Sequence, residues 1–137
     1  MPKRIPPSYR TPPAAHVGRP QGASEVTIAL RQAVQRAADA YRRGEWLEAE
    51  RLCRLVINAN PDHFDALRLL GAIAGQTRRS PEAVELLSRA VAANPNHPET
   101  QNNLGNALKD LNRLEEAVLR YDLAISLKRD YADAYSN

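Results

Sequence analysis

Few side chains in this sequence of 137 residues have the type and spacing that chemistry would need. His63 and His97 are widely separated in the sequence, and no set of His, Cys and Asp residues has the spacing of zinc ligands, so we expect no metal site. Cys53, the one cysteine, falls on the apolar side of a helical pattern, which predicts a small core residue rather than a nucleophile. Asn103 and Asn137 are separated by the same interval as the two histidines and offer different chemistry, because a side-chain amide both donates and accepts hydrogen bonds.

Motifs that would indicate catalysis are missing from the sequence. It contains no glycine-rich phosphate loop, no nucleophile elbow and no dinucleotide-binding motif. The carboxylates of Glu48, Glu50, Glu115 and Glu116 fall on helix faces that we expect to be exposed, with no pocket around them. We therefore predict that the chain is not an enzyme, needs no cofactor and acts by binding.

The elements that must position these residues are paired helices. Between Pro98 and Arg129, apolar residues recur at helical spacing in two runs of about 14 residues, separated by Asn112 and Arg113. Neither apolar stripe could be buried by its own helix. The two helices should therefore pack against each other as a hairpin, and the hairpin should pack against a neighbour.

The same pattern recurs at one fixed interval along the chain. Leu70-Gly71 recurs as Leu104-Gly105. The other pairs at this interval are Ala83 with Ala117, Ala90 with Ala124, and Asn60-Pro61 with Asn94-Pro95. A fixed 34-residue period in two-helix units resembles the tetratricopeptide repeat. The resemblance covers about residues 30–137 and implies an all-α fold, a right-handed α-solenoid of stacked helix–turn–helix units.

Small residues at the matched positions indicate where helix backbones approach one another. Gly71 and Gly105 in the first helices, with Ala83 and Ala117 in the second helices, leave out side chains at the same places of successive repeats. We predict that a larger residue at these places overpacks the hairpin.

The composition changes near residue 25. Residues 1–24 contain six of the ten prolines and four basic residues, with no acidic residue before Glu25. Such a segment cannot bury enough apolar surface to offset the entropy of ordering it, so we predict a disordered, proline-rich basic arm. Of the 19 basic residues, 15 remain in residues 25–137 against 16 acidic ones, so the folded part has a net charge of −1.

Within residues 25–137 we predict a degenerate first repeat at 30–63, regular repeats at 64–97 and 98–131, and the start of a fourth repeat at 132–137. The last segment is either the beginning of a longer array or a short lid on the third repeat. The sequence shows no signal peptide and no apolar run long enough to span a membrane, and its single cysteine fits a reducing compartment, so we expect a cytoplasmic protein.

In tetratricopeptide proteins the stacked first helices line a concave groove that binds partners, and the resemblance implies such a groove here. We predict a protein or extended-peptide partner rather than nucleic acid, because the folded part is near neutral and has no basic stripe. The apolar face after Ile125 also permits end-to-end self-association. The predicted groove residues are Arg68, Leu69, Glu99, Asn102, Asn103, Asn106, Lys109 and Asn137.

Two kinds of tetratricopeptide protein offer a comparison for this groove. Chaperone-binding domains clamp a C-terminal carboxylate with Lys, Arg and Asn side chains. The corresponding places here are Val34, Ala38, Leu69, Glu99 and Asn103. Only the asparagine matches, so a carboxylate clamp is not favoured.

The second comparison is with the repeat arm of O-linked N-acetylglucosamine transferases, which has an asparagine at one groove place in successive repeats. Asn103 and Asn137 match that place, whereas Leu69 and Gln35 do not. We therefore predict an interaction scaffold that binds an extended peptide or a partner protein in its groove. The alternative is the substrate-recognition arm of a larger O-GlcNAc transferase-like glycosyltransferase, whose catalytic domain is absent from this chain.

Overall fold

The computed structural model describes the backbone of residues 12–136 and the side chains of residues 25–133. The described backbone forms six helices and no strand, which confirms the all-α prediction. None of the described helices is long and apolar enough to cross a membrane. The helices are α1 (Pro12–Arg42), α2 (Trp46–Ala59), α3 (Phe64–Gln76), α4 (Ser80–Ala93), α5 (Pro98–Asp110) and α6 (Leu114–Ser136).

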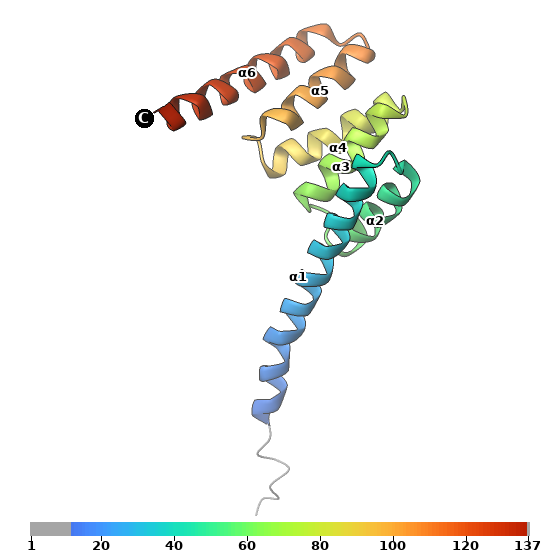
Figure 1. Cartoon of the computed structure of the whole chain (residues 1–137), viewed down its shortest axis with the longest axis vertical. Helices are drawn as coiled ribbons and strands as arrows, with labels where there is room; N and C mark the ends of the chain where they lie inside the picture. The colour runs from blue at the N-terminus through green and yellow to red at the C-terminus, as the bar shows by residue number, and fades with distance from the viewer. Residues whose placement is uncertain (1–11, 137) are drawn as a thin grey trace, which may run out of the picture. The chain divides into compact units, whose positions relative to one another are not determined.

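By its internal contacts the chain divides into two units, Met1–Gln32 and Ala33–Asn137. Within the second unit the helices pair in chain order: α3 packs on α4 and α5 on α6, while α2 contacts α3 and α4 contacts α5 (Figure 1). Each hairpin therefore packs on the next one along the chain. This is the stacked arrangement that the repeat period predicts.

Each first helix ends in the same way. Gly44, Arg78 and Asn112 have positive φ angles of 76°, 64° and 61°, and they occupy the same place in successive repeats. This left-handed residue lets the next amide reach back to a carbonyl five residues earlier, which ends the helix. The bonds run from Glu45 N to Ala40 O (2.8 Å), from Arg79 N to Ala74 O (2.8 Å) and from Arg113 N to Leu108 O (2.9 Å).

The two histidines with matched positions begin helices. The Nδ1 atom of His63 accepts a hydrogen bond from the Ala66 amide, and that of His97 accepts one from the Thr100 amide, each at 3.3 Å. They are therefore the N-caps of α3 and α5. Their spacing reflects the repeat rather than a shared ligand.

The small residues mark close contacts between paired helices, as predicted. A Cβ atom on Gly71 would lie 2.4 Å from Cγ of Leu87, and one on Gly105 would lie 2.8 Å from Cε1 of Tyr121. The alanines at the other matched positions are all buried. They are Ala83, Ala90, Ala117 and Ala124.

Two predicted segment boundaries differ from the structure. Helix α1 begins at Pro12, so its first half runs through the segment predicted as a disordered arm, while residues 1–11 of that arm lie outside the described residues. Proline fits the first helical turn, because its missing amide would have no partner there. The helix thus begins at Pro12-Pro13, within the segment predicted to be a disordered arm.

The second difference is at the C-terminal end, where α6 continues without a break through the predicted start of a fourth repeat at residue 132. The earlier second helices stop at Asn60-Pro61 and Asn94-Pro95. The equivalent residues are Lys128 and Arg129, which are good helix formers. No proline interrupts the helix here, so it extends to Ser136.

Candidate functional site

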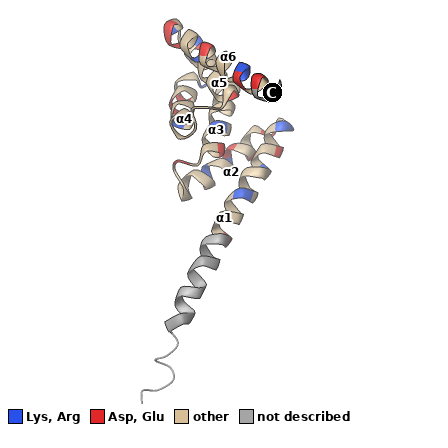
Figure 2. Ribbon diagram, turned by 90° about the vertical axis from the view of Figure 1, so that its left-hand side faces the viewer, with Lys and Arg blue, Asp and Glu red and all other residues tan. Residues whose placement is uncertain are grey.

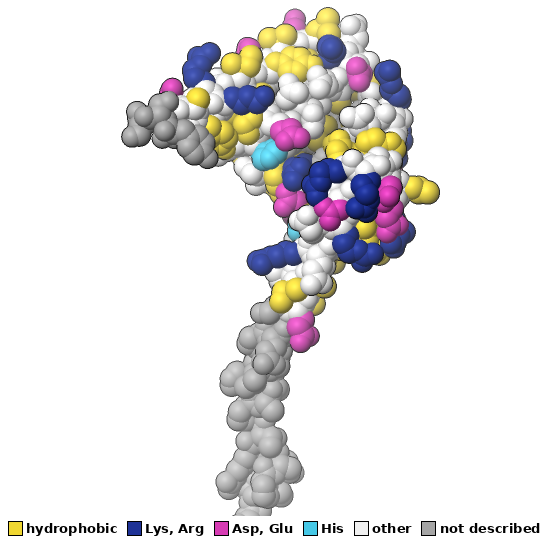
Figure 3. All heavy atoms as spheres, in the orientation of Figure 1, with side chains coloured by type: hydrophobic (Ala, Val, Ile, Leu, Met, Phe, Trp, Pro, Cys, Tyr) yellow, Lys and Arg dark blue, Asp and Glu magenta, His cyan; other side chains and the backbone are white. Residues whose placement is uncertain are grey.

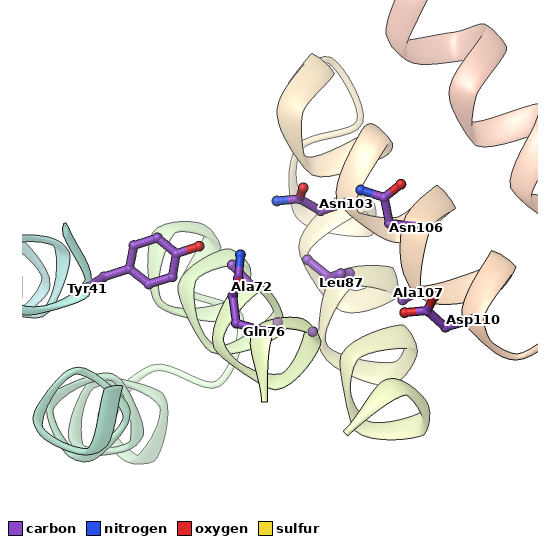
Figure 4. Close-up of a pocket in the computed structure, with 10 residues that line it drawn as sticks. Tyr41, Ala72, Gln76, Leu87, Asn103, Asn106, Ala107 and Asp110 are labelled. Atoms are coloured by element: carbon purple, nitrogen blue, oxygen red, sulfur yellow. The ribbon is translucent and has the colours of Figure 1, made fainter. Parts of the chain in front are cut away.

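A hollow of about 160 Å³ lies among the C-terminal halves of α1, α3 and α5 (Figure 4). Five polar residues line it, and we call it the amide pocket. They are Tyr41, Gln76, Asn103, Asn106 and Asp110. Its other lining residues are small or apolar, namely Gly71, Ala72, Gly75, Leu87 and Ala107.

The hollow exists because α3 presents almost no side-chain bulk at this point. Gly71, Ala72 and Gly75 are three of the α3 residues that line it, and a Cβ atom on Gly75 would meet nothing within 4 Å. Several lining residues of α3 and α5 come from matching places of two repeats. Ala72 and Asn106 are one repeat period apart, as are Gln76 and Asp110.

Most polar groups of the amide pocket are available to a ligand. Asn106 is oriented by a hydrogen bond that its Oδ1 atom accepts from the Tyr121 hydroxyl at 2.6 Å. Four side-chain groups of the pocket form no hydrogen bond or ion pair within the described part of the chain. They are the Tyr41 hydroxyl, the side-chain amides of Gln76 and Asn103, and the Asp110 carboxylate. Asn103 has both an unused donor and an unused acceptor, the property for which the sequence singled it out.

The predicted groove residues do not all reach this pocket. Asn103 and Asn106 line it, whereas Glu99 and Lys109 are exposed outside it and Asn102 is partly buried. Arg68 is partly buried, with its Nε atom 3.0 Å from Asp65 Oδ1 and its guanidinium 5.9 Å from the centre of the Phe64 ring. Asn137 lies outside the described residues.

Leu69 was predicted to line the open groove, but the structure buries it. Its side chain is only 5% exposed. Leu69 lies on α3, which contacts α2, α4 and α5, and α5 likewise contacts three helices, so the difference from Asn103 lies in the side chain. An apolar side chain at this place is drawn into the packing, whereas Asn103 at the equivalent place of α5 stays partly exposed.

Asp110 was missed, although the repeat period from Gln76 points to it. The buried Gln101 was also missed, and it has a structural role. Its amide donates to the Pro95 carbonyl at 2.9 Å and its Oε1 atom accepts from Arg120 at 3.2 Å. Gln101 thereby ties the connector before α5 to both α5 and α6.

The remaining candidates for chemistry are parts of the fold. Cys53 is fully buried, and burial raises the pKa of its thiol to about 12, which confirms it as a protonated core residue. Trp46 packs edge-on to Tyr41, with ring centres 5.0 Å apart. Among the described residues, no group of three or more His, Cys, Asp or Glu side chains is placed to hold a metal ion.

Figure 2 shows acidic and basic residues scattered over the helices of the second unit. The strongest cluster joins two repeats. Glu50 of α2 accepts from Arg79 at 2.7 Å and from Arg54 at 2.8 Å, and Glu82 of α4 contacts the same two arginines. Hydrogen bonds from Arg79 hold the pKa of the Glu50 carboxyl below its ordinary value, against the opposing effect of burial.

Comparisons with solved structures give relatives for this fold. An O-GlcNAc transferase variant of Thermobaculum terrenum is 33% identical with a TM-score of 0.73, over 77% of this chain and 20% of that enzyme. A variant of MamA is 26% identical with a TM-score of 0.65, over 73% of this chain and 58% of MamA. The second tetratricopeptide domain of Spaghetti (RPAP3), bound to an HSP90 peptide, has a TM-score of 0.72 over 77% of this chain and 98% of that domain, at 15% identity.

Family models match the repeats directly, whereas the comparison with curated proteins finds no match. Two models described as tetratricopeptide repeat match residues 34–98 and 86–118, and a model described as TPR repeat matches residues 105–137. Together they cover the chain from residue 34 to residue 137. The chain therefore belongs to the tetratricopeptide repeat family.

Proposed function

We propose that the face of α3 and α5 around the amide pocket binds an extended peptide, or an extended segment of a partner protein. The observation that supports this most is the Asn103 amide, which lines the pocket and has no partner among the described residues. An extended backbone offers one donor and one acceptor per residue, and a side-chain amide can satisfy both. Contacts to backbone tolerate many sequences, so neighbours such as Arg68, Glu99 and Lys109 would select among them.

The family supports the same class of function. Tetratricopeptide repeats are generally interaction scaffolds, and the related Spaghetti domain was solved with a peptide bound. At 15% identity that domain is evidence for the fold alone, and the basic residues of a carboxylate clamp are missing here. The proposal is therefore an amide-based site rather than a carboxylate-based one.

A peptide selection tests this proposal. Random 12-residue peptides displayed on phage are selected on the parent chain and counter-selected on Asn103→Ala, and the enriched peptides are measured by fluorescence anisotropy. Loss of each hydrogen bond should cost about 1 kcal/mol, or roughly fivefold in Kd, with little change in melting temperature. Asn58→Ala is the matched control, since Asn58 is an exposed asparagine of α2 outside the pocket. Enriched peptides that bind the parent and Asn103→Ala equally would contradict the proposal.

A second candidate function is supported by the 33% identity to the Thermobaculum terrenum O-GlcNAc transferase. The chain spans about a fifth of that enzyme, so the enzyme's activity does not transfer with the match. We infer that the repeats could serve as the recognition arm of a larger glycosyltransferase. The coding sequence beyond Asn137 decides between the two: a nucleotide-sugar-binding domain supports the arm, and a stop codon or further repeats support the separate scaffold.

A further inference from the structure

We propose that the amide pocket binds a cationic side chain, lysine or arginine, of the peptide or partner segment that occupies the groove. The inference rests on the proposed function, because it assigns the chemistry of one residue of the bound chain. Three independent features support it: the charge of the pocket, the helix ends that surround it, and its size and acceptors.

The first feature is an uncompensated carboxylate. Asp110 is the charged residue among those that line the pocket, and its carboxylate has no ion-pair partner among the described residues. No basic residue lines the pocket, and Lys109, which precedes Asp110 on α5, is exposed outside it and forms no ion pair among the described residues. Arg42 pairs with Asp39 and Arg68 with Asp65. The pocket therefore has a net negative charge that a bound cation would neutralise.

The second feature is the direction of the helices. Tyr41 is next to the last residue of α1, while Gln76 and Asp110 are the last residues of α3 and α5. The C-terminal end of a helix has a partial negative charge, because its peptide dipoles align along the axis. Three such ends meet at this pocket. Each one favours a cation and disfavours an anion.

The third feature is the fit of a single side chain. The volume of about 160 Å³ is below the range of roughly 300–1,000 Å³ that small-molecule sites occupy, and it suits one long side chain. The amide oxygens of Gln76 and Asn103 are acceptors for ammonium or guanidinium donors. The Tyr41 hydroxyl on one wall is a further acceptor that has no hydrogen bond among the described residues. Figure 4 shows Tyr41 on one side of the hollow and Asn103 and Asp110 on the other.

The same features argue against an anionic occupant. A glutamate, aspartate or C-terminal carboxylate in the pocket would face Asp110 and three helix C-termini. The preferred ligand is therefore opposite in charge to one held by a carboxylate clamp.

Nuclear magnetic resonance with a small probe tests the pocket directly, whatever the partner is. The ¹⁵N-labelled full chain is titrated with N-acetyl-arginine methylamide, and separately with the citrulline analogue, which has nearly the same shape and no charge. We expect the side-chain amide signals of Gln76, Asn103 and Asn106 to shift with the arginine probe only. Asp110→Asn should weaken that binding by about fivefold, the upper range for an exposed ion pair. Asp122→Asn, an exposed carboxylate of α6 outside the pocket, should leave it unchanged.

Equal shifts with citrulline, or an unchanged Kd of the arginine probe for Asp110→Asn, would overturn the inference. Asp110→Asn should keep its melting temperature, since it removes a negative charge from a helix C-terminus. The phage selection separates this inference from the proposed function. Peptides whose binding depends on Asn103 but whose Kd is unchanged for Asp110→Asn would support the proposed peptide groove and contradict the cation site. If the arginine probe binds but no peptide is enriched in the selection, the cation site is supported and the peptide groove is contradicted.

Discussion

Gly71 and Gly105 occupy the same place in two repeats, but the side chains that they face differ in how freely they can change conformation. Gly71 faces Leu87, which is 1% exposed and cannot move without disturbing the core. Gly105 faces the ring of Tyr121, which is partly exposed and can turn toward solvent. Turning would break the hydrogen bond from the Tyr121 hydroxyl to Asn106 in the amide pocket. The same substitution should therefore have different consequences at the two places.

Gly71→Ala should lower the free energy of unfolding by about 1–3 kcal/mol, because the added methyl group overlaps Leu87. Gly105→Ala should cost less. Gly75→Ala is the matched control, because nothing lies within 4 Å of its added Cβ and alanine favours the helix by about 1 kcal/mol over glycine. Urea unfolding of the three variants gives the order of their free energies of unfolding. Equal stability of Gly71→Ala and Gly75→Ala would mean that the close contact with Leu87 does not constrain the fold.

The residues that the sequence identified correctly are those whose role follows from the period. Gly71, Gly105 and the matched alanines could be assigned because close packing requires small side chains at every repeat. The period from Gln76 also points to Asp110, whereas the burial of Leu69 does not follow from the period. Leu69 is 5% exposed, whereas Asn103 at the equivalent place of α5 is partly exposed, although both helices contact three others. Whether a groove place is open therefore depends on the side chain at that place, which differs between repeats.

At the scale of the helix, α2 and α4 are linked by the ion cluster of Glu50, Arg54, Arg79 and Glu82. Glu50 is its most buried member, with a side chain that is 19% exposed. Hydrogen bonds from Arg79 and Arg54 favour the ionised carboxylate, so the pKa of Glu50 is lower in the folded chain than its ordinary value near 4.5. The cluster therefore stabilises the folded state above that pH and loses its contribution as the pH falls through the lowered pKa.

Glu50→Gln should reduce the free energy of unfolding at pH 7 by about 1 kcal/mol, because it removes charge-assisted bonds and leaves Arg54 and Arg79 with Glu82 as their one shared carboxylate. The difference from the parent chain should shrink below pH 4.5. Urea unfolding at pH 7, 5 and 4 measures it. Glu85→Gln, on the exposed face of α4 and outside the ion cluster, is the matched control for the loss of one carboxylate. If the difference in free energy of unfolding were the same at all three pH values, protonation of Glu50 would not be the cause of the predicted pH dependence.

Helix boundaries were predictable where a residue enforces them. Pro61 and Pro95 end two helices, and Gly44 closes α1 with a positive φ angle. The extension of α6 was not predicted, because the repeat pattern suggested a new helix at residue 132 while Lys128 and Arg129 contain nothing that stops the old one. A period places a boundary only when the residues at that boundary also break the helix.

At the scale of the Ala33–Asn137 unit, the last helix differs from its predecessors in what covers it. On α4, Ser80 and Val91 are each 9% exposed, in a hairpin stack in which α5 packs on α4. The equivalent residues of α6, Leu114 and Ile125, are 53% and 54% exposed, and Val118 between them is 55% exposed. In the view of Figure 3, hydrophobic side chains reach the surface along α6. The described part of the chain thus ends in an apolar helix face of the kind that a neighbouring helix covers elsewhere in the array.

We expect a second copy of the chain to cover this face at high concentration. Full burial of an aliphatic side chain is worth about 1.5–3 kcal/mol, so Val118 and Ile125 together are enough for weak association. The double variant Val118→Lys, Ile125→Lys should shift the chain to monomer in sedimentation velocity while its helix content stays the same. Leu47→Lys is the matched control, because Leu47 is an 84% exposed apolar residue of α2. If Leu47→Lys abolishes association and the double variant does not, the contact lies at α2 and the uncovered face of α6 is not what joins the copies.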